Sequence, residues 1–363
     1  MVLSGRRRSP GLSAHPTTLW AVPVGGLGGV ARHVLDVATV GIPGWRLIVL
    51  CPEGDLAHRL RAAGAAVVTG PFGPEAGLVR SVRTLLKHVA AIRPNVLHSH
   101  LAYADVVAAV ARVLTGISLA TTEHGIAGDE KLYHRTRRRA RVRALVHSWR
   151  LRRTDLTIAV SRATRQAMLE KWRPPVDPVI IPNGVEATRR PQPRPPRSSP
   201  RVLSLSRLSP EKQLPELLHA FAELQRRDPG ARLTVAGEGP EREAAEAMTK
   251  ALGLEHVVSF PGFLDASQAM SAADVVIQLS AWENCSYTLL DAVAAGLGVV
   301  ATPVGGNPEI LPEVCLARAT DSRAVAAAIV RQVGNEARPA LPEGWPSRKE
   351  MTARIAAAYG TLL

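Results

Sequence analysis

Two kinds of segment alternate along the chain, and they differ in how their hydrophobic and polar residues are arranged. Short runs of apolar, β-branched residues are separated by longer segments in which apolar residues recur at helical spacing. This alternation is typical of βαβ units and predicts an α/β fold with parallel sheets. In the first half we expect strands at 18–24, 47–50, 66–69, 96–98, 119–122, 156–160 and 179–181, with helices such as 29–39, 78–92 and 104–114 between them.

The same alternation restarts after residue 200. Strands are expected at 201–206, 232–236, 257–260, 274–279 and 299–302, and helices at 213–227, 240–252, 267–272, 287–295 and 322–333. Residues 187–200 carry five prolines and no apolar periodicity, which is typical of an exposed linker. We therefore predict two doubly wound, Rossmann-like domains (1–186 and 201–344) facing each other across a cleft, and a helix over 345–363 that packs back toward the first domain.

Charge is distributed unevenly between these two halves. Residues 1–186 hold 26 basic and 12 acidic residues, whereas 187–363 hold 19 of each, so the first half carries the whole net charge of +14. Such asymmetry favours an anionic partner for the first domain. Base composition in a GC-rich genome is the competing explanation, because arginine greatly outnumbers lysine.

Cysteine content and apolar runs bear on the cellular compartment. The three cysteines, Cys51, Cys285 and Cys315, are widely spaced, so neither a disulfide framework nor a zinc cluster is expected. No run of about 18 apolar residues occurs, and no signal-peptide core follows the N-terminal arginines. We expect a cytoplasmic protein, with peripheral contact to the inner face of the cell membrane left open.

Two loops at predicted strand ends carry glycines. Residues 25–29 (GGLGG) follow the first strand and open a helix, where Gly26 and Gly28 would let an anionic ligand approach the helix N-terminus. The spacing differs from a dinucleotide fingerprint, and a tight structural turn explains it equally well. Gly237 and Glu238 end another strand; taken alone, they also fit a plain turn.

Cations and acids gather in the second half. Arg207 and Lys212 lie on the loop that leaves the strand at 201–206, where two permanent cations suit a diphosphate. Glu283 lies in the loop after the strand at 274–279, and Asp291 lies in the helix that follows, so both can accept hydrogen bonds from sugar hydroxyls. The first-turn amides of that helix predict an anion seat at Ser286, Tyr287 and Thr288.

These pieces together resemble a known family. The segments GGLGG, TEHG (122–125), SRLSPEK (206–212), GEGP (237–240), WENCSYTLLDAVAAG (282–296) and PVGGNPE (303–309) occur in an order that resembles the GT-B glycosyltransferases of retaining family 4. The resemblance spans nearly the whole chain. It implies an acceptor-binding first domain and a second domain that binds a nucleotide diphospho-sugar.

The resemblance also implies roles for individual residues. Arg207 and Lys212 would neutralise the donor diphosphate, Glu283 would hold hydroxyls of the donor sugar, and His124 would face that sugar across the cleft. Asp291 matches an acid that binds ribose in relatives, where glutamate is usual, so a water-bridged or shifted ribose contact is expected. Glycines also stand at 296–298 where relatives commonly carry a proline.

No metal ion or other cofactor is expected. His98 and His100 could be metal ligands, but no third ligand stands at suitable spacing and no Asp-x-Asp motif occurs. Departure of the diphosphate would instead be assisted by cations and helix amides.

A strongly basic segment lies in the first domain. Residues 131–153 contain ten Lys or Arg and no acid, with apolar residues at helical spacing. A solvated helix face is one explanation. The other is docking to an anionic membrane or a lipid-linked or polyanionic acceptor, for which the candidate residues are Arg137, Arg138, Arg139, Arg141 and Arg143. Nucleic acid is not expected, because few aromatic residues accompany the charges.

The sequence therefore predicts a metal-independent, retaining glycosyltransferase of the hexosyltransferase type. Its donor would be a nucleotide diphospho-sugar and its acceptor a glycan, glycolipid or small molecule. Two alternatives stay open: a sugar-nucleotide 2-epimerase of the same fold, and a noncatalytic basic scaffold protein.

Overall fold

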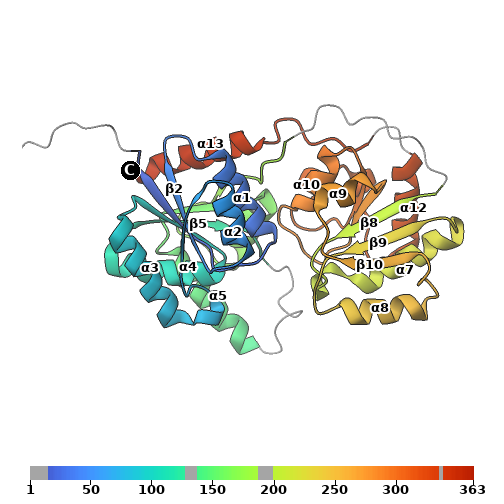
Figure 1. The fold of residues 1–363 in the computed structure, drawn as a ribbon, viewed down its shortest axis with the longest axis horizontal. Helices are drawn as coiled ribbons and strands as arrows, with labels where there is room; N and C mark the ends of the chain where they lie inside the picture. Colours follow the sequence, from blue (N-terminus) through green and yellow to red (C-terminus); the bar gives the residue numbers. More distant parts are fainter. Residues whose placement is uncertain (1–14, 127–136, 187–198, 335–337) are drawn as a thin grey trace, which may run out of the picture.

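The computed structural model describes residues 15–126, 137–186, 199–334 and 338–363. Two α/β lobes lie side by side, each built on a central sheet with helices on its faces (Figure 1). The predicted linker at 187–200 falls almost wholly outside the described residues. The predicted α/β class with two doubly wound sheets is confirmed.

The first lobe contains seven parallel strands in the order β3-β2-β1-β4-β5-β6-β7. Parallel neighbours need crossover connections, and helices supply most of them. The strands are β1 (Thr17–Ala21), β2 (Arg46–Cys51), β3 (Ala66–Thr69), β4 (Val96–His100), β5 (Ser118–Glu123), β6 (Leu156–Ala159) and β7 (Val179–Ile180); the helices are α1 (Gly29–Val40), α2 (Asp55–Ala62), α3 (Leu78–Ile92), α4 (Ala102–Thr115), α5 (Arg137–Leu151) and α6 (Arg162–Lys171).

The second lobe contains five parallel strands in the order β10-β9-β8-β11-β12. Its strands are β8 (Arg201–Leu205), β9 (Arg232–Ala236), β10 (Val258–Gly262), β11 (Val275–Gln278) and β12 (Gly298–Ala301), and its helices are α7 (Leu214–Arg227), α8 (Arg242–Ala251), α9 (Ala266–Ser271), α10 (Tyr287–Ala294), α11 (Asn307–Ile310) and α12 (Ser322–Gly334).

Burial on both faces of each sheet explains the near-continuous apolar strands. In central strand β1, Leu19 packs into a cluster on one face while Trp20 packs into a cluster on the other. Helices show the complementary pattern: α3 buries Leu85 and Val89 and leaves Arg83 exposed. No helix in the described part of the chain is long and apolar enough to cross a bilayer.

The last helix, α13 (Arg348–Tyr359), belongs to the core of the first lobe, although it follows the second in sequence (Figure 1). A capping box between Ser347 and Glu350 begins it. Met351, Ile355 and Tyr359 are fully or almost fully buried in the cluster that contains Trp20. The helix therefore returns across the junction between the two lobes.

A buried arginine attaches helix α5 to the first sheet. The Arg150 side chain is 1% exposed and donates hydrogen bonds to Asp105 and, at 2.6 Å, to Glu123. Burial raises the pKa of the Glu123 carboxyl, and the Arg150 charge opposes that rise. Because two carboxylates compensate the guanidinium, removing either partner would leave an uncompensated buried charge.

The Tyr359 hydroxyl gives a test of how α13 is held. It accepts a hydrogen bond from Trp20 Nε1 at 2.9 Å and contacts His98 Nδ1, and all three side chains are buried. Tyr359→Phe removes this hydroxyl and leaves the buried Trp20 Nε1 and His98 Nδ1 without their hydrogen-bond partner. We expect the free energy of unfolding in urea to fall by about 1–3 kcal/mol.

Tyr103→Phe is the matched control, because the Tyr103 hydroxyl bonds Ser81 Oγ at 3.0 Å in a less buried position. Its effect should be smaller. If the two substitutions lowered the free energy of unfolding equally, the Tyr359 hydroxyl would not be an important attachment of α13.

Candidate active site

Side chains at the carboxyl ends of the two sheets meet across the junction between the lobes. Asn284, in the loop after β11, accepts hydrogen bonds from the Ile126 amide at 3.2 Å and from Thr164 Oγ1 at 2.9 Å in the first lobe. Asn183, just after β7, donates to the Cys285 carbonyl at 2.9 Å. The loops that carry His124 in the first lobe and Glu283 in the second therefore border one shared region.

Two of these residues, Lys212 and Glu283, are in direct contact. Lys212 Nζ donates to Glu283 Oε1, which also accepts hydrogen bonds from Gln278 Nε2 at 2.7 Å and Ser280 Oγ at 2.8 Å. The two side chains are 17% and 12% exposed. Three donors on one oxygen fix the orientation of the Glu283 carboxylate.

The loop of Glu283 rests on a second glycine loop. Gly305 has φ +51°, and a Cβ there would lie 1.6 Å from the Glu283 carbonyl oxygen; a Cβ at Gly306 would lie 1.8 Å from the Asn284 carbonyl oxygen. Only glycine allows this close approach. The PVGGNPE segment thus supports the backbone that presents Glu283.

The first turn of α10 is the predicted anion-binding site, and the side chains of that turn fix its position through hydrogen bonds. Ser286 is the N-cap: its Oγ accepts from the Leu289 amide at 3.4 Å and donates to Gln278 Oε1 at 2.9 Å. Thr288 Oγ1 donates to the Leu205 carbonyl at 3.2 Å, which fastens α10 to the end of β8. The Tyr287 hydroxyl lies 3.4 Å from His33 Nδ1 of the first lobe. These side chains position the helix end.

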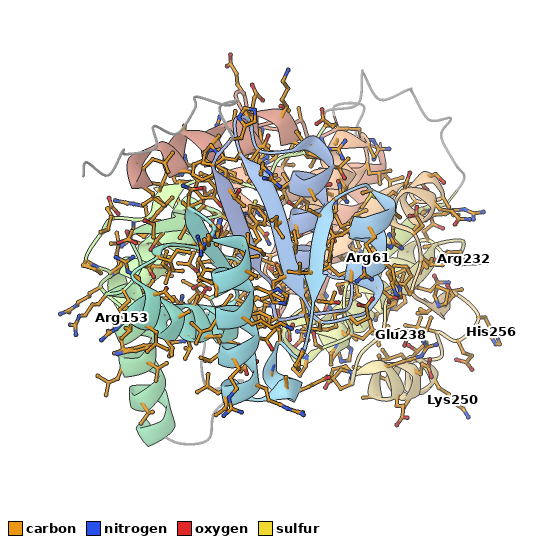
Figure 2. The ribbon with its side chains drawn as sticks, turned by 60° about the vertical axis from the view of Figure 1, so that its left-hand side comes forward. Arg61, Arg153, Arg232, Glu238, Lys250 and His256 are labelled. Carbon is orange, nitrogen blue, oxygen red and sulfur yellow. The ribbon has the colours of Figure 1, made fainter. Side chains whose placement is uncertain are left out.

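Arg207 pairs with Glu211, the residue before Lys212, and is largely exposed. Its guanidinium donates to Glu211 at 2.8 Å, and its side chain is 69% exposed. Gly237 has φ +134°, and a Cβ there would lie 1.9 Å from the Ser206 carbonyl oxygen, so the glycine lets two loops pack together. The Glu238 side chain is 60% exposed and pairs with Arg242 at 3.0 Å on the surface of the second lobe (Figure 2).

The first glycine loop leaves open space in front of α1. A Cβ at Gly26 or Gly28 would meet no heavy atom within 4 Å. This space is compatible with the predicted approach of a ligand to the start of α1.

A salt bridge from α1 crosses the junction to Asp291. Arg32 donates to both Asp291 oxygens, at 3.0 and 3.4 Å, and its Nε donates to Asp36 at 2.9 Å. The guanidinium also lies over the Tyr287 ring, 5.2 Å from its centroid. Burial raises the pKa of the Asp291 carboxyl, and the Arg32 charge opposes this rise. The carboxylate that the family resemblance assigns to ribose is therefore engaged by an arginine.

His124 belongs to a cluster of histidines around Trp20. His124 Nε2 lies 2.9 Å from His100 Nδ1, and its ring centroid lies 4.9 Å from that of His33. Burial lowers the pKa of all three imidazoles, which are neutral at pH 7. His98 is engaged elsewhere: Nδ1 contacts the Tyr359 hydroxyl and Nε2 contacts Thr122 Oγ1 at 2.8 Å.

Sequence reasoning missed five residues of this region. His33, Arg32, Asn183, Asn284 and Gln278 are all buried or part of a contact between elements distant in sequence. Asn183 and Gln278 carry one usable signal, since each is a polar residue at or just after the end of a predicted strand. Nothing in the local pattern around Arg32 indicates a partner in the other lobe.

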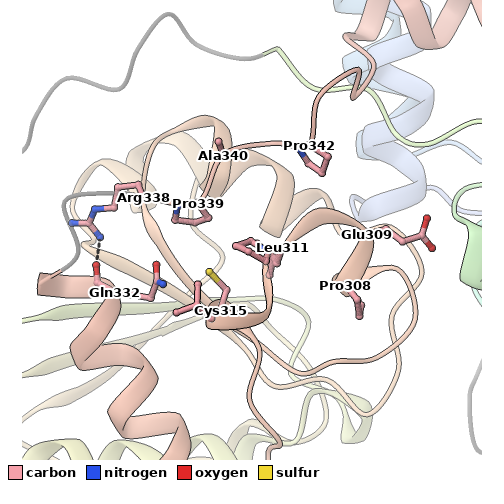
Figure 3. Close-up of a pocket in the computed structure, with 11 residues that line it drawn as sticks. Pro308, Glu309, Leu311, Cys315, Gln332, Arg338, Pro339, Ala340 and Pro342 are labelled. Atoms are coloured by element: carbon pink, nitrogen blue, oxygen red, sulfur yellow. Dashed lines mark hydrogen bonds between the residues drawn. The ribbon is translucent and has the colours of Figure 1, made fainter.

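Two surface pockets lie outside this region. The larger, of about 470 Å³, is in the second lobe and is bounded by residues such as Cys315, Gln332, Arg338 and Pro342 (Figure 3). The smaller, of about 270 Å³, lies beside β7 and α13. Neither is lined by a predicted site residue.

The predicted docking arginines fall in α5. The backbone of Arg137, Arg138, Arg139, Arg141 and Arg143 is helical, but their side chains lie outside the described residues. In the same helix, Val142 and Leu145 are 60% and 69% exposed. Trp149, nearer the end of α5, packs against the core cluster that contains Leu85 and Val89.

Comparison with known proteins matches each lobe to a glycosyltransferase family model. Residues 27–189 match the model described as "Glycosyltransferase Family 4", and residues 185–333 match "Glycosyl transferases group 1". The chain belongs to the family 4 glycosyltransferases. It is therefore a glycosyltransferase with the GT-B fold, as the sequence predicts.

Individual relatives agree with this assignment. The glycosyltransferase is 25% identical to the glycogen synthase of Mycobacterium tuberculosis, over 92% of this chain and 89% of that one. It is 29% identical to the alpha-monoglucosyldiacylglycerol synthase of Streptococcus pneumoniae, over 46% of this chain and 40% of the relative. The fold matches HepE of Anabaena, solved with UDP and glucose, at a TM-score of 0.74 and 23% identity, covering 94% and 95% of the two chains.

The Arg32–Asp291 pair generates a pH-dependent prediction. An aspartate whose pKa is raised in the fold contributes stability that is full below its unfolded pKa, about 3.9, and is lost as the pH rises through the folded value. Arg32→Met removes the opposing charge and raises the pKa of Asp291 further. The free energy of unfolding in urea should then fall more steeply between about pH 4 and 7 than in the wild type.

The Arg32→Met/Asp291→Asn double variant serves as the control. In this double variant Asp291 no longer titrates. Its free energy of unfolding should therefore fall less steeply between about pH 4 and 7 than that of Arg32→Met. Parallel pH profiles for Arg32→Met and the wild type would show that the pair has no electrostatic coupling.

Proposed function

We propose that this glycosyltransferase moves a sugar from a nucleotide diphospho-sugar to an acceptor hydroxyl with retention at the anomeric carbon and without a metal ion. The observation that carries the proposal is the Lys212–Glu283 contact, because it puts a cation for the diphosphate beside a carboxylate for sugar hydroxyls. Both residues lie at the carboxyl edge of the second sheet, where ligands of doubly wound folds bind.

Each part of the donor has a chemically suited partner. Lys212, with Arg207 nearer the solvent and the α10 amides, supplies positive charge for the diphosphate. Glu283, held through Oε1, leaves Oε2 as a hydrogen-bond acceptor for sugar hydroxyls. Asp291 is the carboxylate suited to ribose. HepE, solved with UDP and glucose, offers a precedent for such a donor in this fold.

The chemical step follows from these groups. The acceptor oxygen forms a bond to the anomeric carbon on the face that the diphosphate leaves, and the bond from that carbon to the phosphate oxygen breaks. The hydroxyl proton passes to the departing diphosphate. Lys212 stabilises the negative charge that develops there, so the electrostatic role of a metal ion is filled by the protein. His124, neutral and close to the junction, can accept a hydrogen bond from the sugar.

The proposal is tested with purified protein, EDTA and a panel of UDP-, GDP- and dTDP-sugars. Thermal shift identifies the bound nucleotide, since a ligand that binds only the folded state raises its apparent stability. Turnover is then measured with saccharide acceptors, and the anomeric configuration of the product is determined by NMR. We expect transfer in EDTA with retention. Glu283→Gln and Lys212→Met should each lower kcat/KM by about 10²- to 10³-fold.

Glu246→Gln is the matched control, because Glu246 is an exposed acid paired with Arg242 on α8. It should retain wild-type turnover. Inversion at the anomeric carbon, or loss of activity in EDTA that added metal restores, would contradict the proposed mechanism. Epimerised or free sugar without an acceptor would support the epimerase.

We further propose that helix α5 docks on the anionic cytoplasmic leaflet of a membrane, where a lipid-linked acceptor would be presented. Val142, Leu145 and Val146 stay exposed within a segment of ten basic and no acidic residues. Arg150 and its two carboxylates hold the other end of α5 on the sheet. Apolar side chains beside clustered cations complement an anionic interface, where each cation adds about 1 kcal/mol.

Sedimentation with vesicles tests this docking. Val142→Ser/Leu145→Ser should weaken binding to phosphatidylglycerol vesicles several-fold, and added salt should weaken binding of the wild type. The control is Val113→Ser/Leu114→Ser, because these residues near the end of α4 are similarly exposed, at 62% and 63%. Equal binding to neutral phosphatidylcholine vesicles, or equal effects of the two double variants, would overturn the docking proposal.

A further inference from the structure

Three histidines from separate elements of the first lobe converge beside Trp20. His33 lies on α1, His100 ends β4 and His124 follows β5, and one ring nitrogen from each lies within 4.8 Å of the others. Their ring centroids are 4.9 to 5.8 Å apart. His33 and His100 are 2% and 0% exposed, whereas His124 is partly accessible.

The hydrogen-bond network leaves a lone pair on His33. Asn183 donates through Nδ2 to the Cys285 carbonyl, so its Oδ1 is the atom that faces His33 Nδ1 at 3.2 Å. Oδ1 can only accept, which puts the His33 proton on Nδ1 and leaves Nε2 as an unprotonated nitrogen. Nε2 is buried and has no hydrogen-bond partner among the described residues. A histidine whose other nitrogen donates to a carbonyl oxygen is the arrangement typical of metal ligands.

His100 also has an unsatisfied nitrogen. Its Nδ1 faces His124 Nε2 at 2.9 Å, and its Nε2 is buried without a partner in the described part of the chain. His98 differs, because both of its nitrogens are engaged by Tyr359 and Thr122. The candidate donors are therefore His33, His100 and His124, and coordination of a metal ion by His100 and His124 together replaces the hydrogen bond between them.

We propose that His33, His100 and His124 form a binding site for a borderline transition-metal cation such as Zn²⁺, and that its occupancy inhibits the glycosyltransferase. Three imidazoles with a fourth position open suit Zn²⁺, and oxygen-preferring Mg²⁺ is excluded by the donor set. The inhibitory part rests on the proposed function, in which His124 faces the donor sugar: a metal ion on His124 takes the lone pair and the space that the sugar needs.

Cobalt spectroscopy tests the site independently of activity. Co²⁺ added to the intact protein should give the strong visible absorption of a tetrahedral complex, and Zn²⁺ should abolish it by displacement. His33→Gln should lose the absorption. Asn183→Ser, which removes the partner of His33 Nδ1, should lower metal affinity by about 10- to 100-fold. His256→Gln, at an exposed histidine of the second lobe, is the matched control and should bind as the wild type does (Figure 2).

The results of these experiments test the metal site and the proposed glycosyltransferase activity independently. Weak octahedral absorption in the wild type, or unchanged absorption in a folded His33→Gln, overturns the site. If His33→Gln does not fold, Asn183→Ser and the wild-type spectrum still decide the question. Zn²⁺ should inhibit sugar transfer by the wild type, with recovery in EDTA and a higher half-inhibitory concentration for Asn183→Ser. Tetrahedral Co²⁺ binding without any transfer activity would count against the proposed function alone, whereas transfer insensitive to bound Zn²⁺ would overturn the inhibition.

Discussion

Parallel strand pairing in both described sheets is the constraint on which the rest of the structure depends. Because neighbouring strands run in the same direction, their carboxyl ends share one edge of each sheet, and the loops that leave them gather there. The two edges are joined by polar contacts of Asn183, Asn284 and Arg32 with the opposite lobe. Lys212, Glu283 and His124, which are far apart in sequence, consequently border one region.

The fold and part of the site could be predicted from the sequence for the same reason. Apolar runs of strand length, with helical periodicity between them, determine the layers without knowledge of any particular contact. Lys212 and Glu283 follow neighbouring strands, so their proximity was predictable. The pairing of Glu238 with Arg242 was not, since it depends on rotamers and local competition between charges. Arg32 gains its partner Asp291 from the opposite lobe, and His33 gains its partners from distant segments of its own lobe. Local periodicity carries no information about either.

The salt bridge between Asp291 and Arg32 of the opposite lobe bears on the role proposed for Asp291 in donor binding. Asp291 lies in α10, and its carboxylate, one methylene shorter than the glutamate usual in relatives, accepts hydrogen bonds from both terminal nitrogens of Arg32. A ribose hydroxyl that binds Asp291 would compete with this guanidinium for the same two oxygens. If Asp291 binds ribose as proposed, donor binding and the contact between the lobes would be coupled through this carboxylate, next to the Arg32 guanidinium that lies over the Tyr287 ring.

The return of α13 to the first lobe has a consequence for how the protein is made. Trp20 and Tyr359 share a buried hydrogen bond although almost the whole chain separates them. During synthesis from the N-terminus, the seven strands of the first sheet emerge long before Met351, Ile355 and Tyr359 can cover its core. The second lobe, whose sheet and helices α7 to α12 are contiguous in sequence, can complete the core cluster around Phe221 earlier. The domain that begins first is thus completed only after the second lobe has been synthesised, and the apolar surface around Trp20 stays uncovered until residues 351–359 have emerged.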